Sequence, residues 1–71
     1  MDRQLELRHL ALADRHLSEG QARVEAQQAL LRVLQERGAA TVDAERLLVL
    51  FRATLAEWER HREMIAAELS G

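Results

Sequence analysis

The sequence predicts an all-α protein, an antiparallel two-helix hairpin that dimerises into a four-helix bundle with coiled-coil-like packing. Strong helix formers dominate the composition, Pro is absent, and one Phe and one Trp are present. Apolar residues recur at steps of three and four along two long segments, which a short Gly-Ala-Ala-Thr turn separates. A chain of 71 residues forms one domain, 1–71, that buries only about 60% of its unfolded surface, so self-association is expected.

Residues 2–37 are predicted to form the first helix. Two series of positions seven residues apart form one apolar stripe, a spacing typical of left-handed coiled-coil-like packing: Leu10, Leu17, Val24 and Leu31, with Ala13, Gly20, Gln27 and Leu34. Gln27 is expected to form a polar layer that fixes the register. Ser18 to Gln21 matches a capping box, so a break into two helices is the alternative. The stripe keeps its phase through Gly20, which favours a continuous helix.

A turn is predicted at residues 38–41. Gly38 suits the left-handed position that follows a helix end. Thr41 is expected to cap the next helix, and Asp43 lies in its first turn, where a negative charge suits the helix dipole. A connection this short makes the two helices antiparallel neighbours.

The second helix is predicted at about 42–70. Its apolar stripe comprises Ala44, Leu48, Phe51, Leu55, Trp58, Ile65 and Leu69. Arg62 interrupts the stripe near Leu17, with Asp14 about one turn away, so we expect an ion pair at this end of the bundle. Binding of an anionic ligand by Arg62 is the alternative. If the hairpin folds about residues 39–40, Leu55 faces Val24 and Trp58 lies over Gly20. Our hypothesis is that Gly20 provides the space that the large Trp58 ring occupies.

Several apolar residues lie beside the stripes and would remain in solvent in a single hairpin. Together with two large side chains of the second stripe, they form the predicted interface between two hairpins: Leu12, Leu30, Val33, Leu47, Leu50, Phe51 and Trp58. Each fully buried Leu or Val contributes about 1.5–3 kcal/mol, which favours pairing. A dimer with two-fold symmetry is the simplest closed arrangement.

Histidine and glutamate side chains offer two alternative metal or ligand sites. Glu6 and His9 have the Glu-x-x-His spacing of di-iron bundles. His16 and His61 are expected to approach across the hairpin, with Glu57 one turn before His61. Surface histidines that pair with carboxylates have the same pattern, so no metal or cofactor is assigned.

The remaining features disfavour other function classes. The net charge of −2 and the alternation of Arg with Glu are not typical of nucleic-acid binding, and no apolar run is long enough to span a membrane. We find no nucleophile–base pair or glycine-rich phosphate loop, so an enzyme is not expected. The sequence therefore suggests a cytoplasmic, self-associating module that binds an unknown protein partner. A metal- or ligand-binding bundle is the alternative, and a nucleic-acid-associated regulator is the second alternative.

The spacing of several residues also resembles a known group of proteins. The pattern begins at Asp14-Arg15-His16-Leu17, continues through Gly20, Gln27, Gly38 and Thr41, and ends at Glu68-Leu69. Over residues 9–69 it resembles short uncharacterised helical proteins of soil alphaproteobacteria. Those proteins carry a more acidic turn where this chain has Ala39-Ala40. The resemblance implies a bacterial helical hairpin and brings no activity with it.

Overall fold

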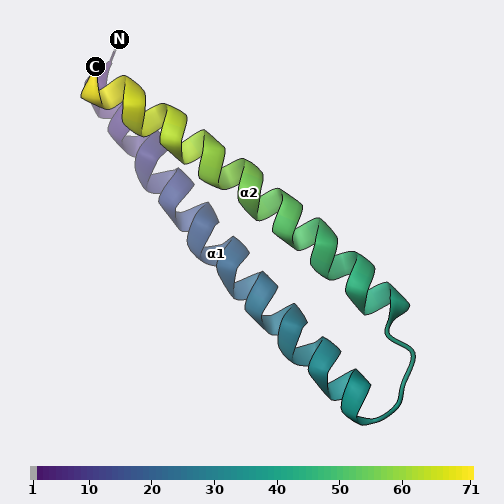
Figure 1. Ribbon diagram of the computed structural model, residues 1–71. Helices are drawn as coiled ribbons and strands as arrows, with labels where there is room; N and C mark the ends of the chain where they lie inside the picture. The colour runs from purple at the N-terminus through teal and green to yellow at the C-terminus, as the bar shows by residue number, and fades with distance from the viewer. Residues whose placement is uncertain (1) are drawn as a thin grey trace.

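The computed structural model describes residues 2–71. Over this range the chain forms two helices and no strands, α1 (Arg3–Glu36) and α2 (Val42–Ser70). The helices lie side by side and antiparallel, so both chain ends lie at the same end of the molecule (Figure 1). The Cα atoms span 54 × 14 × 13 Å, and the long dimension is close to that of a straight 34-residue helix. The predicted two-helix hairpin is confirmed.

Helix α1 begins at a well-formed cap and continues without a break. The Asp2 carboxylate oxygen Oδ1 accepts hydrogen bonds from the backbone amides of Gln4 (2.9 Å) and Leu5 (3.3 Å). These bonds satisfy two of the amides that a helix start leaves without backbone partners. The helix runs through Gly20. The alternative of two shorter helices divided by a capping box at Ser18 is therefore wrong.

The end of α1 forms a Schellman motif. Gly38 has a φ of +67°, the left-handed conformation predicted for it. Its amide donates to the Gln35 carbonyl at 3.1 Å, and the Ala39 amide donates to the Leu34 carbonyl at 2.9 Å. The following residues then run back along the helix axes before α2 begins, so the end of α1 extends past the start of α2 (Figure 1).

Helix α2 begins after Thr41, but the cap differs from the prediction. The Thr41 side chain was expected to accept a backbone amide. Instead, its hydroxyl donates to the Glu45 carboxylate, with 3.4 Å between Oγ1 and Oε1. Thr41 has φ −118° and ψ −6°, rather than the extended backbone usual for a capping residue. The start of the helix was correctly predicted, and the capping hydrogen bond was not.

The two predicted stripes face each other. Every residue assigned to them is buried or half-buried in the hairpin, including the polar Gln27 and Arg62. The most buried side chains within residues 2–71 are nevertheless few, and two of the five belong to alanine: Ala13, Gln27, Ala44, Leu48 and Ile65. Two helices can cover only one side of each other, so the hairpin has a narrow core.

The register of the two helices differs from the prediction by about one turn. A Cβ atom placed on Gly20 would lie 3.1 Å from Cδ1 of Leu55 and 4.0 Å from its Cα. Leu55 therefore occupies the space above Gly20, and the hypothesis that Trp58 lies there is wrong. The cause is the connection after Gly38, which runs along the helices and shifts α2 relative to α1 (Figure 1).

Candidate functional site

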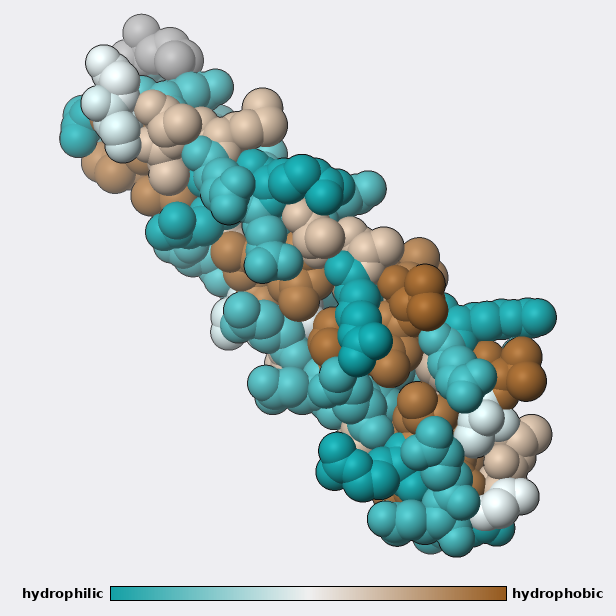
Figure 2. Space-filling view, in the orientation of Figure 1, coloured by the Kyte–Doolittle hydropathy of each residue, from teal (hydrophilic) through white to brown (hydrophobic). Residues whose placement is uncertain are grey.

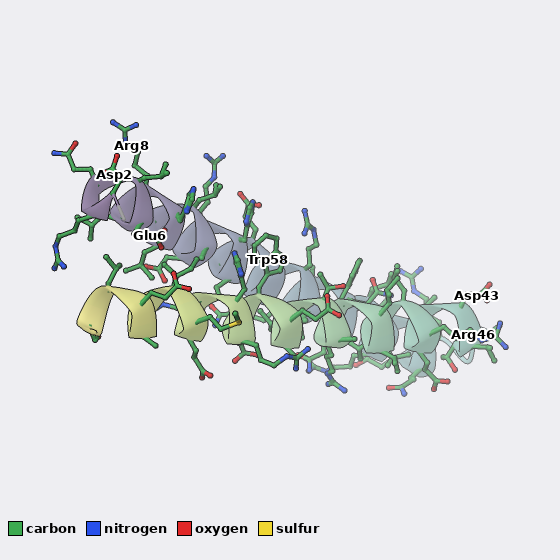
Figure 3. All side chains as sticks on the ribbon, turned by 90° about the horizontal axis from the view of Figure 1, so that it is seen from above. Asp2, Glu6, Arg8, Asp43, Arg46 and Trp58 are labelled. Atoms are coloured by element: carbon green, nitrogen blue, oxygen red, sulfur yellow. The ribbon has the colours of Figure 1, made fainter. Side chains whose placement is uncertain are left out.

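Trp58 lies at the centre of a small cluster of rings midway along the hairpin. Its side chain extends from α2 toward α1 (Figure 3). The ring centroid of His16, on α1, lies 4.1 Å from that of Trp58, with the planes tilted by 44°. His61, one turn after Trp58 on α2, makes an edge contact at 5.7 Å and 70°. Both histidines thus contact the indole, one from each helix.

One ring nitrogen of His16 is buried without a hydrogen bond in the described part of the chain. Among residues 2–71, its buried Nδ1 atom has no hydrogen-bond partner. A neutral imidazole carries one N–H donor and one acceptor nitrogen, and a buried nitrogen without a partner costs free energy. The sequence suggested His16 as a ligand through its spacing to His61. It gave no indication that Trp58 would cover the ring.

Glu57, Trp58 and His61 line a shallow, open depression beside this cluster. Within residues 2–71, no three His, Asp or Glu side chains converge as a metal site requires. Glu6 is half-buried in the first turn of α1, whereas His9 is exposed. The depression offers an aromatic surface, one imidazole and one carboxylate.

Gln27 makes the one buried side-chain hydrogen bond between the helices in residues 2–71. Its Nε2 atom donates to the Ala44 carbonyl of α2 at 3.0 Å, and the residue is only 7% exposed. A buried amide bonded across a helix pair favours one register over its neighbours. The predicted polar layer is therefore present, with a backbone carbonyl as its partner.

Arg62 pairs with Asp14, as predicted from its position in the second stripe. The Arg62 Nε atom lies 2.6 Å from Oδ1 of Asp14. Both side chains keep about half of their surface in solvent, at 41% and 51%. An ion pair this exposed contributes at most about 1 kcal/mol. It marks one edge of the contact between the helices and leaves little charge free to bind a ligand.

Most of the predicted interface residues reach solvent in the hairpin. Leu12, Leu30, Val33, Leu47 and Leu50 are between 39% and 59% exposed, whereas Phe51 and Trp58 are half-buried. On the side shown in Figure 2, hydrophobic side chains appear between hydrophilic ones, most densely over the half of the molecule nearest the loop. The five exposed side chains therefore remain at the surface of the hairpin.

Comparisons with known proteins give no further assignment. No protein-family model, curated protein or solved structure matches this chain. Within residues 2–71, neither helix combines the length and apolar character needed to cross a bilayer. The exposed apolar side chains and the Trp58 cluster are the features that a proposed function has to explain.

Proposed function

We propose that this chain is a non-enzymatic, cytoplasmic interaction module that acts as a homodimer. In the dimer, two hairpins pack into a four-helix bundle, and the outer surface of the bundle binds another protein. The observation that carries the proposal is the exposure of ten large apolar side chains within residues 2–71, against four buried ones, two of which are alanines. A chain of 71 residues has too little core to leave that surface in water without cost.

The energetics favour pairing of two hairpins. Full burial of one Leu or Val side chain contributes about 1.5–3 kcal/mol. Partial burial of several such residues therefore contributes free energy comparable to the whole stability of a small domain, which is about 5–15 kcal/mol. A bundle of four helices gives each helix two neighbours, so apolar residues beside the stripes also become buried.

The two hydroxyl groups of α2 each donate to a carbonyl of their own helix. Thr54 Oγ1 donates to the Leu50 carbonyl at 3.0 Å, and Ser70 Oγ donates to the Ala66 carbonyl at 2.9 Å. Both groups are engaged with the preceding turn of their own helix. Each hydroxyl thus donates its proton to a backbone carbonyl, whereas the hydroxyl of a nucleophile donates to a general base.

Thermal unfolding at several protein concentrations tests the proposal. If folding is coupled to dimerisation, mass action raises the stability by about 1.4 kcal/mol of dimer for each tenfold increase in concentration. The melting temperature, followed by circular dichroism, is expected to rise by several degrees between about 1 and 100 µM. A melting temperature that is constant across this range would contradict the proposal.

A further inference from the structure

The contacts between the helices distinguish two faces of the hairpin. On one side, His16 and His61 both contact Trp58. On the other side, Asp14 pairs with Arg62. We call the first side the histidine face and the second the ion-pair face. Residues seven apart lie on the same line along a coiled-coil helix, so these contacts assign the rest of each helix to a face.

The histidine face carries most of the exposed apolar surface. Leu30 lies fourteen residues after His16, and Leu47 lies fourteen before His61, so both lie on this face. The positions three residues after this line on each helix lie beside it, and they add further large apolar side chains. Of the ten large apolar side chains exposed in the described chain, seven lie here: Leu5, Leu12, Leu30, Val33, Leu47, Leu50 and Met64.

The ion-pair face is mainly polar. The line through Asp14 on α1 continues with Gln21, Gln28 and Gln35. The corresponding line on α2 contains Glu45, Arg52 and Glu59. Leu7, Val42 and Val49 are the exposed large apolar residues on this side within residues 2–71. The two faces of the hairpin thus differ in their affinity for water.

We propose that the histidine face is the docking surface for a second copy of this chain and that the ion-pair face stays in solvent. This inference rests on the proposed self-association. The hairpin exposes 5450 Å², whereas a compact monomer of 8.1 kDa exposes about 4,500 Å². The excess is close to the ~800 Å² that each partner buries in a standard protein interface.

The charges on the histidine face also favour a second copy over a lipid surface. Glu19 and Arg23 project from α1 near the middle of this face, and Glu57 projects from α2. A two-fold axis brings the same patch against itself, so acidic groups of one copy can meet basic groups of the other. An anionic membrane would instead repel the Glu57 carboxylate, whereas Glu19 already pairs with Arg15 of its own helix at 3.0 Å.

Two neighbouring residues provide a matched test of the two faces. Leu50 (histidine face) and Val49 (ion-pair face) are 59% and 67% exposed within α2. We expect L50E to weaken the dimer at least about tenfold, because it places a charge in an apolar interface. V49E adds the same charge on the other face, so its dissociation constant is expected to stay within about threefold of wild type. Sedimentation velocity over a concentration series measures both constants.

Each outcome is informative. A dimer that both substitutions weaken equally, or that neither weakens, would overturn the assignment of the face and leave self-association intact. A wild-type chain that stays monomeric would overturn the proposed function itself. If that monomer bound anionic vesicles and L50E did not, the face would belong to a lipid surface and the inference would be wrong.

A second measurement avoids introducing a charge into the interface. The chain has no cysteine, so L50C and V49C each give one labelling site. A polarity-sensitive fluorophore at position 50 is expected to shift to the blue as the protein concentration rises, whereas one at position 49 stays unchanged. The opposite pattern would assign the interface to the ion-pair face.

Discussion

Gly20 allows Leu55 to approach the backbone of α1. The 3.1 Å separation between a Cβ built on Gly20 and the Leu55 Cδ1 atom is tighter than ordinary van der Waals contact. The Leu55 Cα, at 4.0 Å, belongs to the backbone and cannot rotate away. Gly lowers helix stability by about 1 kcal/mol relative to Ala. Close packing against Leu55 accounts for its presence within α1.

We predict that G20L lowers the free energy of unfolding by about 1–3 kcal/mol, because a large side chain would force the helices apart. G20A serves as the control. Its methyl group requires only a small rotation of the Leu55 side chain, and Ala favours the helix, so its effect should be much smaller. Urea unfolding curves measure both. Equal stability of G20L and wild type would contradict this packing.

Gln27 is the residue whose hydrogen bond sets the register near the loop. Its amide donates to the Ala44 carbonyl in a buried position. We predict that Q27E is less stable than wild type by about 1–3 kcal/mol at about pH 7, because two oxygen acceptors then face each other. At about pH 4 the new carboxyl is protonated and can donate, so the difference from wild type should shrink.

The direction in which the stability of Q27E changes with pH follows from the difference between the folded-state and unfolded-state pKa values of the new carboxyl. Burial beside a carbonyl oxygen raises the pKa of the introduced carboxyl above its value in the unfolded chain. The protonated carboxyl therefore contributes fully to the folding stability below its unfolded-state pKa. This contribution is lost as the pH rises through the folded-state pKa. Q27M has no titrating group at this position, so its loss of unfolding free energy relative to wild type should be equal at both pH values. A deficit of Q27E that did not change with pH would contradict the proposed hydrogen bond.

At the scale of elements, the Schellman motif at Gly38 ends α1 and determines where α2 begins. Within the described residues, a Cβ at Gly38 would meet nothing within 4 Å, so a substitution acts through backbone conformation alone. We predict that G38A lowers the free energy of unfolding by about 1–2 kcal/mol. G38N should cost less, since Asn tolerates positive φ. Chemical unfolding measures both, and an unchanged G38A would show that the left-handed turn is not required.

The positions of the helices and stripes could be predicted from the sequence because they depend on local patterns. Periodicity located the buried residues, and Gly38 located the turn. The partner of Gly20 could not be predicted in the same way. It depends on the path of the residues after Gly38, which shifts α2 by about one turn. The contact between His16 and Trp58 follows from that shift, so no pattern within one helix contains it.

At the scale of the whole molecule, the hairpin is a slender rod. Its Cα atoms extend 54 Å in one direction and only 14 and 13 Å in the others. Each helix therefore has one neighbour, and ten large apolar side chains within residues 2–71 stay exposed beside the stripes. A second hairpin on the histidine face would bury Leu30, Leu47 and Leu50, which are 39–59% exposed in the single hairpin.

The molar mass of the wild-type chain in solution tests the central claim most directly. Size-exclusion chromatography with light scattering at micromolar concentration is predicted to give twice the 8.1 kDa of one chain. The peak should elute as a compact particle, because two rods packed side by side are less elongated than one. A mass of 8.1 kDa that persists as the concentration is raised would contradict the account.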